Sequence, residues 1–586
     1  MHLQPLDWLL IALYFVLTIA IGVYYSWRAG KSTTEFFLSG RNLPWWLAGT
    51  SMVATTFAAD TPLAVTELVA TKGIAGNWLW WNMALGGMFT VFFFARLWRR
   101  SGILTDVELT ELRYSGKAAS FLRGFRAVYL GIFMNCIIMG WVNLALASIL
   151  QGLFGIPAEV VLWYVVGCMI LVAVYSALSG LWGVAVTDVF QFVIAMGGTI
   201  VLAVVVVSLP EVGGITGLQQ KLSASTFQFL PHIGGDGPSA GTALGLTISA
   251  FLAYIAIQWW ASWYPGAEPG GGGYVAQRMM SAKDEKHSLL ATLWFTVAHY
   301  CLRPWPWIIT GLVTLVLYPE LSDADKKLGY VYAMRDHLPT GFLGLLVAAF
   351  LAAYMSTIAT HLNWGTSYVI NDFYRRFMKT DGTEKHYVLV SRLATIGMMI
   401  FSVIVTANMQ TITGAWAFIL EAGAGLGLVL ILRWYWWRVN AWSEIAGMIA
   451  PFLGLALVKT QTGIQFPESL FVIVAFTTLC WLVVTFLTKP TDEATLIKFY
   501  RRAHPGGVLW KPIADKVCDV KGDSEFGGLF VNWVAGIALV YMTLFGTGKL
   551  IFGDITTALL FYAIAFVAGW LIYRDLSKRG WGAVTQ

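Results

Sequence analysis

Long apolar runs with almost no charge recur along the whole of this 586-residue chain. Hydrophobic residues make up 58% of the sequence and charged residues only 12%. A single soluble core cannot bury that many apolar side chains, whereas runs of about 20 apolar residues are long enough to cross a bilayer as helices. The sequence therefore predicts an all-α polytopic membrane protein.

We expect about fifteen membrane spans. Their predicted centres lie near residues 17, 58, 88, 140, 168, 195, 253, 305, 357, 396, 425, 450, 478, 537 and 563. Lysine and arginine gather in the loops that follow odd-numbered spans, and the alternate loops hold few of them. Because cytoplasmic loops are rich in basic residues, this pattern predicts an N-terminus outside and a C-terminus in the cytoplasm. It also accounts for the net charge of +6 without a nucleic-acid partner.

The sequence lacks the common motifs of soluble enzymes and of metal sites. It has no Walker loop or HExxH motif, and its five cysteines are scattered. The first residues lack the basic region and cleavage site of a secretory signal, so we expect the first helix to be kept. The segment 489–527 is the one sizeable polar stretch, and it is too short for a catalytic domain.

The stretch Val347–Tyr374 carries hydroxyl side chains within an apolar, helix-length run. Helical spacing puts Ser356 and Thr360 on one face, with Thr357 beside them. Hydroxyl and carbonyl oxygens at bilayer depth suit a small, hard cation that has lost its water. The alternative is that these hydroxyls bond to the preceding turn or allow close helix packing.

Ionisable residues inside predicted spans are a second kind of functional candidate, because each costs about 2.5–3.5 kcal/mol or more at a helix centre. Five of them stand out: Asp60, Glu67, Asp188, Arg303 and Glu421. The alternative for each is a structural ion pair or a side chain that reaches the membrane surface.

Two spans carry signs of interruption. Pro62 lies in the middle of the second span, among threonines and Asp60, and removes a helix hydrogen bond. The seventh span ends in a run of aromatic residues, then Pro265 and Gly266, and four glycines follow at 270–273, which we interpret as a flexible connection. Interrupted helices at corresponding places in two halves indicate a transporter site near the middle of the membrane.

Four motifs fall in one family order at matching spans. They are LPWW followed by GTSMVAT (43–55), SGLWGVAVTDVFQ (179–191), YVAQRMMSAKDEKH (274–287) and the hydroxyl-bearing helix that ends in NDFY (371–374). From about residue 5 to 490 the sequence resembles the sodium:solute symporter family. The resemblance implies a LeuT-like inverted repeat of five plus five spans, with one extra N-terminal and about four extra C-terminal helices.

This organisation predicts six regions. They are an N-terminal span and loop (1–40), the first repeat (41–210), the second repeat (243–440), two peripheral spans (441–488), a cytoplasmic loop (489–527) and two C-terminal spans with a short tail (528–586).

The resemblance also implies a sodium site. Carried over residue by residue, it consists of the carbonyls of Ala54, Phe57 and Ala353 and the hydroxyls of Ser356 and Thr357. Asp188 matches the acid of the family's TD-x-x-Q motif, which with Thr360 implies a second sodium site or a coupling group. Ala359 stands where that second site wants a hydroxyl, so the number of sodium ions stays open.

The solute pocket is predicted from residue types near the two interruptions. Our candidates are Asp60, Thr61, Trp81, Asn82, Gln258, Trp263 and Tyr264. Aromatic faces stack on sugars, on other rings and on cations, and the sequence does not choose among these.

The predicted function is sodium-coupled import of a small organic solute (a sugar, amino acid or carboxylate) across the inner (plasma) membrane by alternating access. We expect a monomer with Na⁺ as its only cofactor and no enzymatic activity. Three alternatives remain open: a solute sensor on the same fold, a proton-coupled symporter using Asp60 or Asp188, and a membrane-embedded enzyme using those acids with Glu421 and His361.

Overall fold

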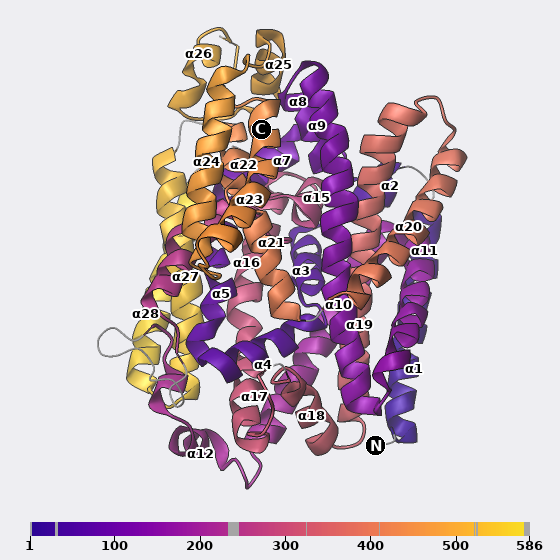
Figure 1. The fold of residues 1–586 in the computed structure, drawn as a ribbon, viewed down its shortest axis with the longest axis vertical. Helices are drawn as coiled ribbons and strands as arrows, with labels where there is room; N and C mark the ends of the chain where they lie inside the picture. The colour runs from indigo at the N-terminus through magenta and orange to yellow at the C-terminus, as the bar shows by residue number, and fades with distance from the viewer. Residues whose placement is uncertain are drawn as a thin grey trace.

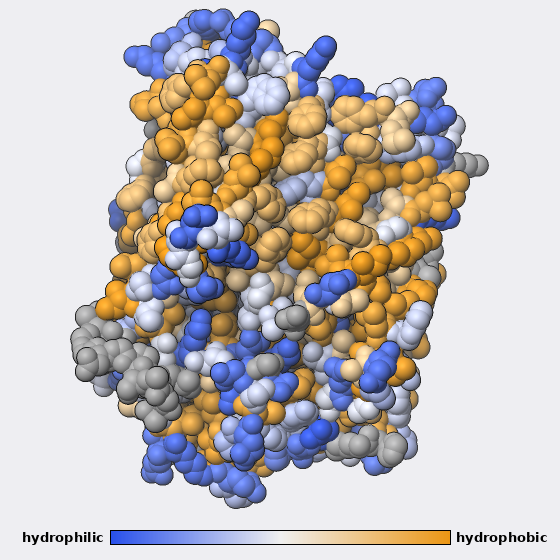
Figure 2. Space-filling view, viewed as in Figure 1, coloured by the Kyte–Doolittle hydropathy of each residue, from blue (hydrophilic) through white to orange (hydrophobic). Residues whose placement is uncertain are grey.

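The computed structural model describes residues 3–578 apart from 30–32, 232–244, 324, 410, 518, 521 and 523–525. Most helices run along the long axis of the molecule, and apolar residues cover the middle of the face seen in Figure 2 while hydrophilic residues gather at both ends (Figures 1 and 2). Among the described residues, 11 helices are long and apolar enough to cross a membrane, and shorter apolar helices accompany them. The chain is therefore a multi-pass membrane protein, as predicted.

Residues 45–207 contain the second to sixth predicted spans, each at its expected place. Their helices are α3 (Trp45–Thr56), α4 (Asp60–Lys72), α5 (Trp78–Trp81), α6 (Met83–Phe89), η3 (Thr90–Phe94), α7 (Ala95–Ser101), α9 (Gly116–Val128), η5 (Tyr129–Met134), α10 (Asn135–Phe154) and α11 (Ala158–Val207). The fifth and sixth spans are the two arms of α11, which turns sharply at Gly180, where φ is 55°.

Residues 248–435 contain the seventh to eleventh predicted spans. Their helices are α13 (Ile248–Leu252), η7 (Ala253–Gln258), α14 (Trp259–Ala261), α15 (Gly273–Ser281), α16 (Glu285–Val297), η8 (Ala298–Leu302), α17 (Pro304–Leu317), α19 (Phe342–Ser367), η9 (Tyr368–Met378), α20 (Glu384–Ala407), α21 (Ile412–Ala422) and α22 (Leu426–Tyr435). The hydroxyl-bearing helix α19 is buried along almost its whole length.

Five long helices lie outside these two segments: α1 (Pro5–Ala29), α23 (Ala441–Gln461), α24 (Ser469–Leu487), α27 (Phe526–Ile551) and α28 (Ile555–Lys578). The short connecting helices are α2 (Thr33–Leu38), η1 (Ser39–Arg41), η2 (Ile74–Asn77), η4 (Asp106–Glu108), α8 (Leu109–Arg113), α12 (Gly214–Lys221), η6 (Ala224–Phe227), α18 (Leu328–His337), α25 (Glu493–Ala503), η10 (Val508–Trp510) and α26 (Lys511–Ala514). Figure 1 shows α25 and α26 at one end of the molecule and α12 at the other. The described residues 489–517 and 210–230 thus lie at opposite ends, which is the relative placement that the loop charges predict.

The second span is broken before its proline. Helix α3 ends at Thr56, Phe57 leaves the helical region with φ −87° and ψ 73°, and α4 begins at Asp60. Pro62 therefore lies in the first turn of α4, where its missing N–H would have had no helical partner. The interruption is real, but the proline begins the new helix and does not kink a continuous one.

The seventh span is broken over residues 262–272, and its glycine run is buried. The indole of Trp98 donates a hydrogen bond to the carbonyl of Gly270 at 2.8 Å. Gly271 has a φ of +78°, and a Cβ atom placed on it would lie within 3.1 Å of Met279, Trp98 and Thr90. A side chain at Gly271 would meet these atoms in a backbone conformation that disfavours any Cβ. The expectation of a loose, flexible connection was wrong, because the run is packed inside the bundle.

A third interruption, which we did not predict, divides the eleventh span at residues 423–425. It pairs with the break in the seventh span: the N–H of Trp263 donates to the carbonyl of Gly423 at 3.1 Å, and that of Gly425 donates to Ala261 at 2.9 Å. Buried backbone groups must find partners within the protein when lipid surrounds it. The two breaks satisfy each other.

Candidate functional site

An internal cavity lies between the broken segments. The space open to the centres of water-sized molecules is about 80 Å³, several times the roughly 10–15 Å³ that one water needs. Its walls come from the α3–α4 break, α5, α10, residues 264–267, η8, α19 and α21. These segments come from both halves of the chain, so the cavity lies between helices of a bundle, which is a typical position for a small-molecule site.

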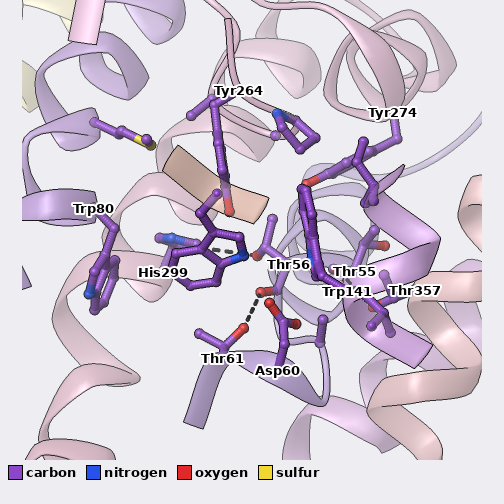
Figure 3. Close-up of a pocket in the computed structure, with 18 of the residues that line it drawn as sticks. Thr55, Thr56, Asp60, Thr61, Trp80, Trp141, Tyr264, Tyr274, His299 and Thr357 are labelled. Atoms are coloured by element: carbon purple, nitrogen blue, oxygen red, sulfur yellow. Dashed lines mark hydrogen bonds between the residues drawn. The ribbon is translucent and has the colours of Figure 1, made fainter. Parts of the chain in front are cut away.

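Asp60 supplies the acidic group of this cavity (Figure 3). Its side chain is 2% exposed, and its Oδ1 atom has no hydrogen-bond partner. Because Asp60 is the first residue of α4, the positive end of that helix dipole stabilises a carboxylate there. The neighbouring Thr61 hydroxyl donates to the carbonyl of Thr56 at 3.5 Å and so reaches across the break.

Aromatic rings form most of the remaining wall. Trp80 and Tyr300 stack with their centroids 5.8 Å apart, and Trp141 and Tyr264 are nearly parallel at 6.3 Å. Trp416 meets Tyr264 edge to face at 6.1 Å. In Figure 3, Trp80, Trp141 and Tyr264 stand around the space above Asp60. The rings support one another, which fixes their faces toward a bound molecule.

A buried arginine holds the end of α3. Arg303 donates to the carbonyls of Val53 at 3.2 Å and Thr56 at 2.9 Å, and to the Thr56 hydroxyl at 2.7 Å. It also lies 2.9 Å from Nδ1 of His299; since arginine can only donate, that nitrogen accepts and His299 is neutral. The guanidinium thus compensates the free carbonyls and the negative dipole end of α3.

The residues predicted to bind sodium lie on two segments that contact each other: Ala54 and Phe57 at the end of α3, and Ala353, Ser356 and Thr357 on α19. All five are at most 3% exposed. The hydroxyl of Thr357 donates to the carbonyl of Thr55 at 3.1 Å, so α19 directly contacts the last turn of α3. The hydroxyl of Ser356 donates to Oδ1 of Asp188 at 2.6 Å. A hydroxyl that coordinates a cation offers a lone pair and must send its proton elsewhere, and both hydroxyls do so here.

Asp188 lies in a fully partnered polar cluster next to these hydroxyls. Its second oxygen accepts a hydrogen bond from Ser51 at 2.6 Å. Arg278, which is completely buried, donates to Ser51 at 3.3 Å and to the Thr360 hydroxyl at 3.1 Å. The guanidinium therefore supplies a positive charge among the groups that the sequence suggested for a second sodium.

The structure brings together only part of the predicted solute pocket. Asp60, Thr61 and Tyr264 line the cavity. Four other candidates do not, namely Trp81, Asn82, Gln258 and Trp263. The amides of Asn82 and Gln258 both donate to the carbonyl of Leu79, at 2.9 and 2.8 Å, and so serve the short helix α5.

Several lining residues were missed by sequence reasoning. They are Thr56, Trp80, Trp141, Tyr274, His299, Tyr300 and Trp416. In the run Trp78–Trp81 every position but one is tryptophan, so the sequence alone could not tell which face of the helix points inward. Trp141 and Trp416 come from distant helices and carried no sequence signal that tied them to Asp60.

The other ionisable residues inside spans have structural partners. Glu67 accepts a hydrogen bond from Thr413 at 2.7 Å, and Glu421 accepts one from Ser469 at 2.5 Å. His361 is paired with Asn135, whose side chain contacts both its ring and its carbonyl. These contacts give Glu67 and Glu421 a place in helix packing, whereas His361 also lines the cavity that Asp60 borders.

Broken helices that face a central cavity inside an all-α membrane bundle define a secondary transporter. The fold is that of a substrate-bound, outward-open Na⁺-coupled sialic acid symporter: 83% of this chain matches 99% of that one, with a TM-score of 0.64 at 19% identity. This match establishes the LeuT-like fold that the sequence predicted.

The chain belongs to the sodium:solute symporter family, whose family model matches residues 36–451. It is similar to a sodium/glucose cotransporter of Vibrio parahaemolyticus, with 25% identity across 84% of this chain and 92% of the relative. It is also similar to a sodium/mannose cotransporter of Bos taurus, with 24% identity across 79% of this chain and 80% of that protein. The chain is therefore a sodium-coupled membrane symporter and not an enzyme, as predicted.

Proposed function

We propose that this protein imports a small organic solute together with sodium, with Na⁺ bound by Ala54, Phe57, Ala353, Ser356 and Thr357. One observation carries the proposal: the segment 55–60, which contains the break, borders the cavity through Ala58 and Asp60 and contacts α19 through the carbonyl of Thr55. An ion that holds α3 against α19 also fixes that wall of the cavity. Each ligand would then raise the affinity for the other, and such reciprocal coupling is what symport requires.

One sodium ion per cycle fits the polar cluster best. The Thr360 hydroxyl and Ser51 both accept hydrogen bonds from Arg278, and Asp188 accepts hydrogen bonds from Ser51 and Ser356. The guanidinium of Arg278 therefore already supplies the positive charge for these groups. One charge moving through 100 mV supplies about 2.3 kcal/mol, which corresponds to a roughly fifty-fold concentration ratio. A single ion is therefore enough for useful accumulation.

The test is uptake into proteoliposomes that contain the purified full-length protein. A thermal-shift screen of sugars, amino acids, amines and carboxylates, in NaCl and in KCl, first identifies compounds that stabilise the protein only with sodium. We expect a hit to accumulate inside vesicles under an inward Na⁺ gradient and not under an equal K⁺ gradient. Uptake driven by a pH gradient without sodium would favour the proton-coupled alternative, and binding without accumulation would favour a sensor.

The proposed orientation places the α25–α26 end of the molecule in the cytoplasm and the N-terminus outside, in the inner (plasma) membrane. The basic loops support it, since they follow odd-numbered spans. An epitope added before Met1 should be accessible to antibody on intact spheroplasts, whereas one inserted into the 489–527 segment should become accessible only after permeabilisation. The reverse pattern would overturn the orientation without affecting the symport proposal.

A further inference from the structure

We infer that the solute carries a positively charged nitrogen, bound by the carboxylate of Asp60 within a cage of aromatic rings. The inference rests on the proposed function, because it concerns the solute that enters with sodium. It departs from the two cotransporters named above, whose names refer to glucose and mannose.

The first support is the state of Asp60. Its carboxylate is buried, forms no ion pair with any described residue, and has an oxygen without a hydrogen-bond partner. It is also the one acidic side chain in the wall of the cavity. A buried carboxylate with an unpartnered oxygen and no opposite charge in contact is costly, and a cationic ligand supplies both the missing charge and a hydrogen-bond donor or close contact. Binding of a cation would then relieve the unfavourable burial of the Asp60 carboxylate, and this relief would contribute to the binding free energy.

The nearest buried guanidinium does not take this role. Arg303 acts on Asp60 only at a distance, because the hydrogen bonds found for it go to Val53, Thr56 and His299. Those bonds hold the end of α3, where the free carbonyls already need a cation. Arg303 is not among the residues that line the cavity, so a solute would meet the carboxylate and not the guanidinium.

The second support is the aromatic wall. Trp80, Tyr300, Trp141, Tyr264 and Trp416 all line the cavity and contact one another in pairs. The faces of such rings carry negative potential, and rings arranged around a carboxylate are the arrangement that attracts ammonium groups. Two negative features of different kinds, a carboxylate and several ring faces, thus point at the same space (Figure 3).

A sugar is less well served by the same walls. Sugar recognition needs many side-chain donors and acceptors that are free to bond, since each buried hydroxyl must be satisfied. Here the Thr56 hydroxyl is engaged by Arg303 and by backbone carbonyls, and Thr61 reaches the Thr56 carbonyl. Much of the remaining lining is apolar, including Met83, Ile138 and Val142. The other polar groups of the lining include the hydroxyls of Tyr264, Tyr274 and Tyr300 and the indole N–H of Trp416, all of which belong to aromatic rings, and Asp60 is the acidic group among them.

Choline and its neutral carbon analogue 3,3-dimethylbutan-1-ol test the charge directly, because the two have nearly the same shape. The measurement is the shift in unfolding temperature of the purified full-length protein in NaCl, with tetramethylammonium and galactose as further probes. We expect choline or tetramethylammonium to stabilise the protein and the neutral analogue to do so only at concentrations at least about 30-fold higher. Equal potency of the neutral analogue, or stabilisation by galactose alone, would overturn the inference.

Variants assign the effect to Asp60. Asp60→Asn should weaken binding of the cationic probe about 30-fold or more, Asp60→Glu should retain most of it, and Glu67→Gln, on the same helix but outside the cavity, should leave it unchanged. Unchanged cation binding in Asp60→Asn would overturn the inference. Stabilisation by NaCl alone is the internal control: if sodium no longer stabilises the wild type, the proposed function fails, whereas retained sodium stabilisation with no cationic preference defeats only this inference.

Discussion

Asp60 and Asp188 are both aspartates buried at membrane depth, but their surroundings are opposite. Asp188 accepts hydrogen bonds from Ser51 and Ser356 and has Arg278 one hydroxyl away. Asp60 has an oxygen without a partner and faces a cavity. The Asp188 carboxylate is part of a complete hydrogen-bond network within the protein, whereas the Asp60 carboxylate has an oxygen that a bound ligand can contact.

The difference separates two uses of buried charge. A completed network stabilises the fold and sets the field around the neighbouring α19 hydroxyls, so its loss should be seen first as lost stability. An incomplete one destabilises the free protein slightly and is completed by a ligand, so its loss should be seen first as lost binding. The following changes test that division, from the largest expected effect to the smallest.

Asp188→Ala should lower the free energy of unfolding by about 3 kcal/mol or more, because it leaves the guanidinium of Arg278 buried without compensation. Thermal unfolding in detergent measures this. Asp60→Ala is the matched comparison and should change stability little. Stability should largely return in the double variant Asp188→Ala/Arg278→Met; equal losses in both single variants would remove the distinction between the two aspartates.

Arg303→Lys should destabilise the protein by about 2 kcal/mol. Lysine keeps the charge, but a single ammonium cannot donate at once to Val53, Thr56 and His299 as the guanidinium does. The loss should appear in thermal unfolding and also as weaker sodium binding, since the end of α3 is less well held. A variant as stable as the wild type would show that charge alone, without the fork geometry, holds the break.

Ser356→Ala and Thr357→Ala should each weaken sodium binding about tenfold, because each removes one predicted oxygen ligand. Sodium-dependent tryptophan fluorescence or thermal shift measures the affinity. Thr366→Ala, on the same helix and bonded to Thr395, is the control and should bind sodium normally. Unchanged affinity in both Ser356→Ala and Thr357→Ala would refute the assigned sodium site.

Glu111 lies outside the membrane spans, and its substitution should give the smallest loss of stability. It provides a partly exposed ion pair to compare with the buried network of Asp188. Its partial burial acts to raise the pKa, but hydrogen bonds from Arg376 and Arg123 outweigh this and lower the pKa of Glu111 to about 2. A depressed pKa means that the ionised form stabilises the fold above its ordinary pKa of 4.5, and that this stabilisation is lost as the pH falls toward 2.

Glu111→Gln should therefore lower stability by about 1 kcal/mol at neutral pH, and the difference from the wild type should shrink as the pH falls from 4.5 toward about 2. Unfolding temperatures of both proteins across a pH series test this. Glu384→Gln, whose ion pair with Arg375 is long and largely exposed, should have no measurable effect. A loss at Glu111 as large as that at Asp188 would mean that burial is not what separates these networks.

Sequence reasoning predicted the spans well because their signal is local. Each predicted centre falls in a helix or between two halves of one, including the break near residue 58. The break at 423–425 was missed because it contains no proline and depends on pairing with Trp263, which is distant in the sequence. The glycine run was misinterpreted for a related reason: glycine permits both flexibility and close packing, and only the neighbouring Trp98 and Phe94 decide between them.

The composition and spacing of residues alone determined the helical membrane fold and the hydroxyl-bearing helix, because bilayer thickness and helical periodicity act over a few turns of one chain segment. The family and the predicted sodium ligands came from the resemblance that the four motifs carry. The tertiary structure decided which tryptophans face the cavity, that Arg278 stands beside Asp188, and that Asp60 has an oxygen without a partner. Those facts depend on side chains from helices far apart in sequence, and their distances are set by packing that no local pattern encodes.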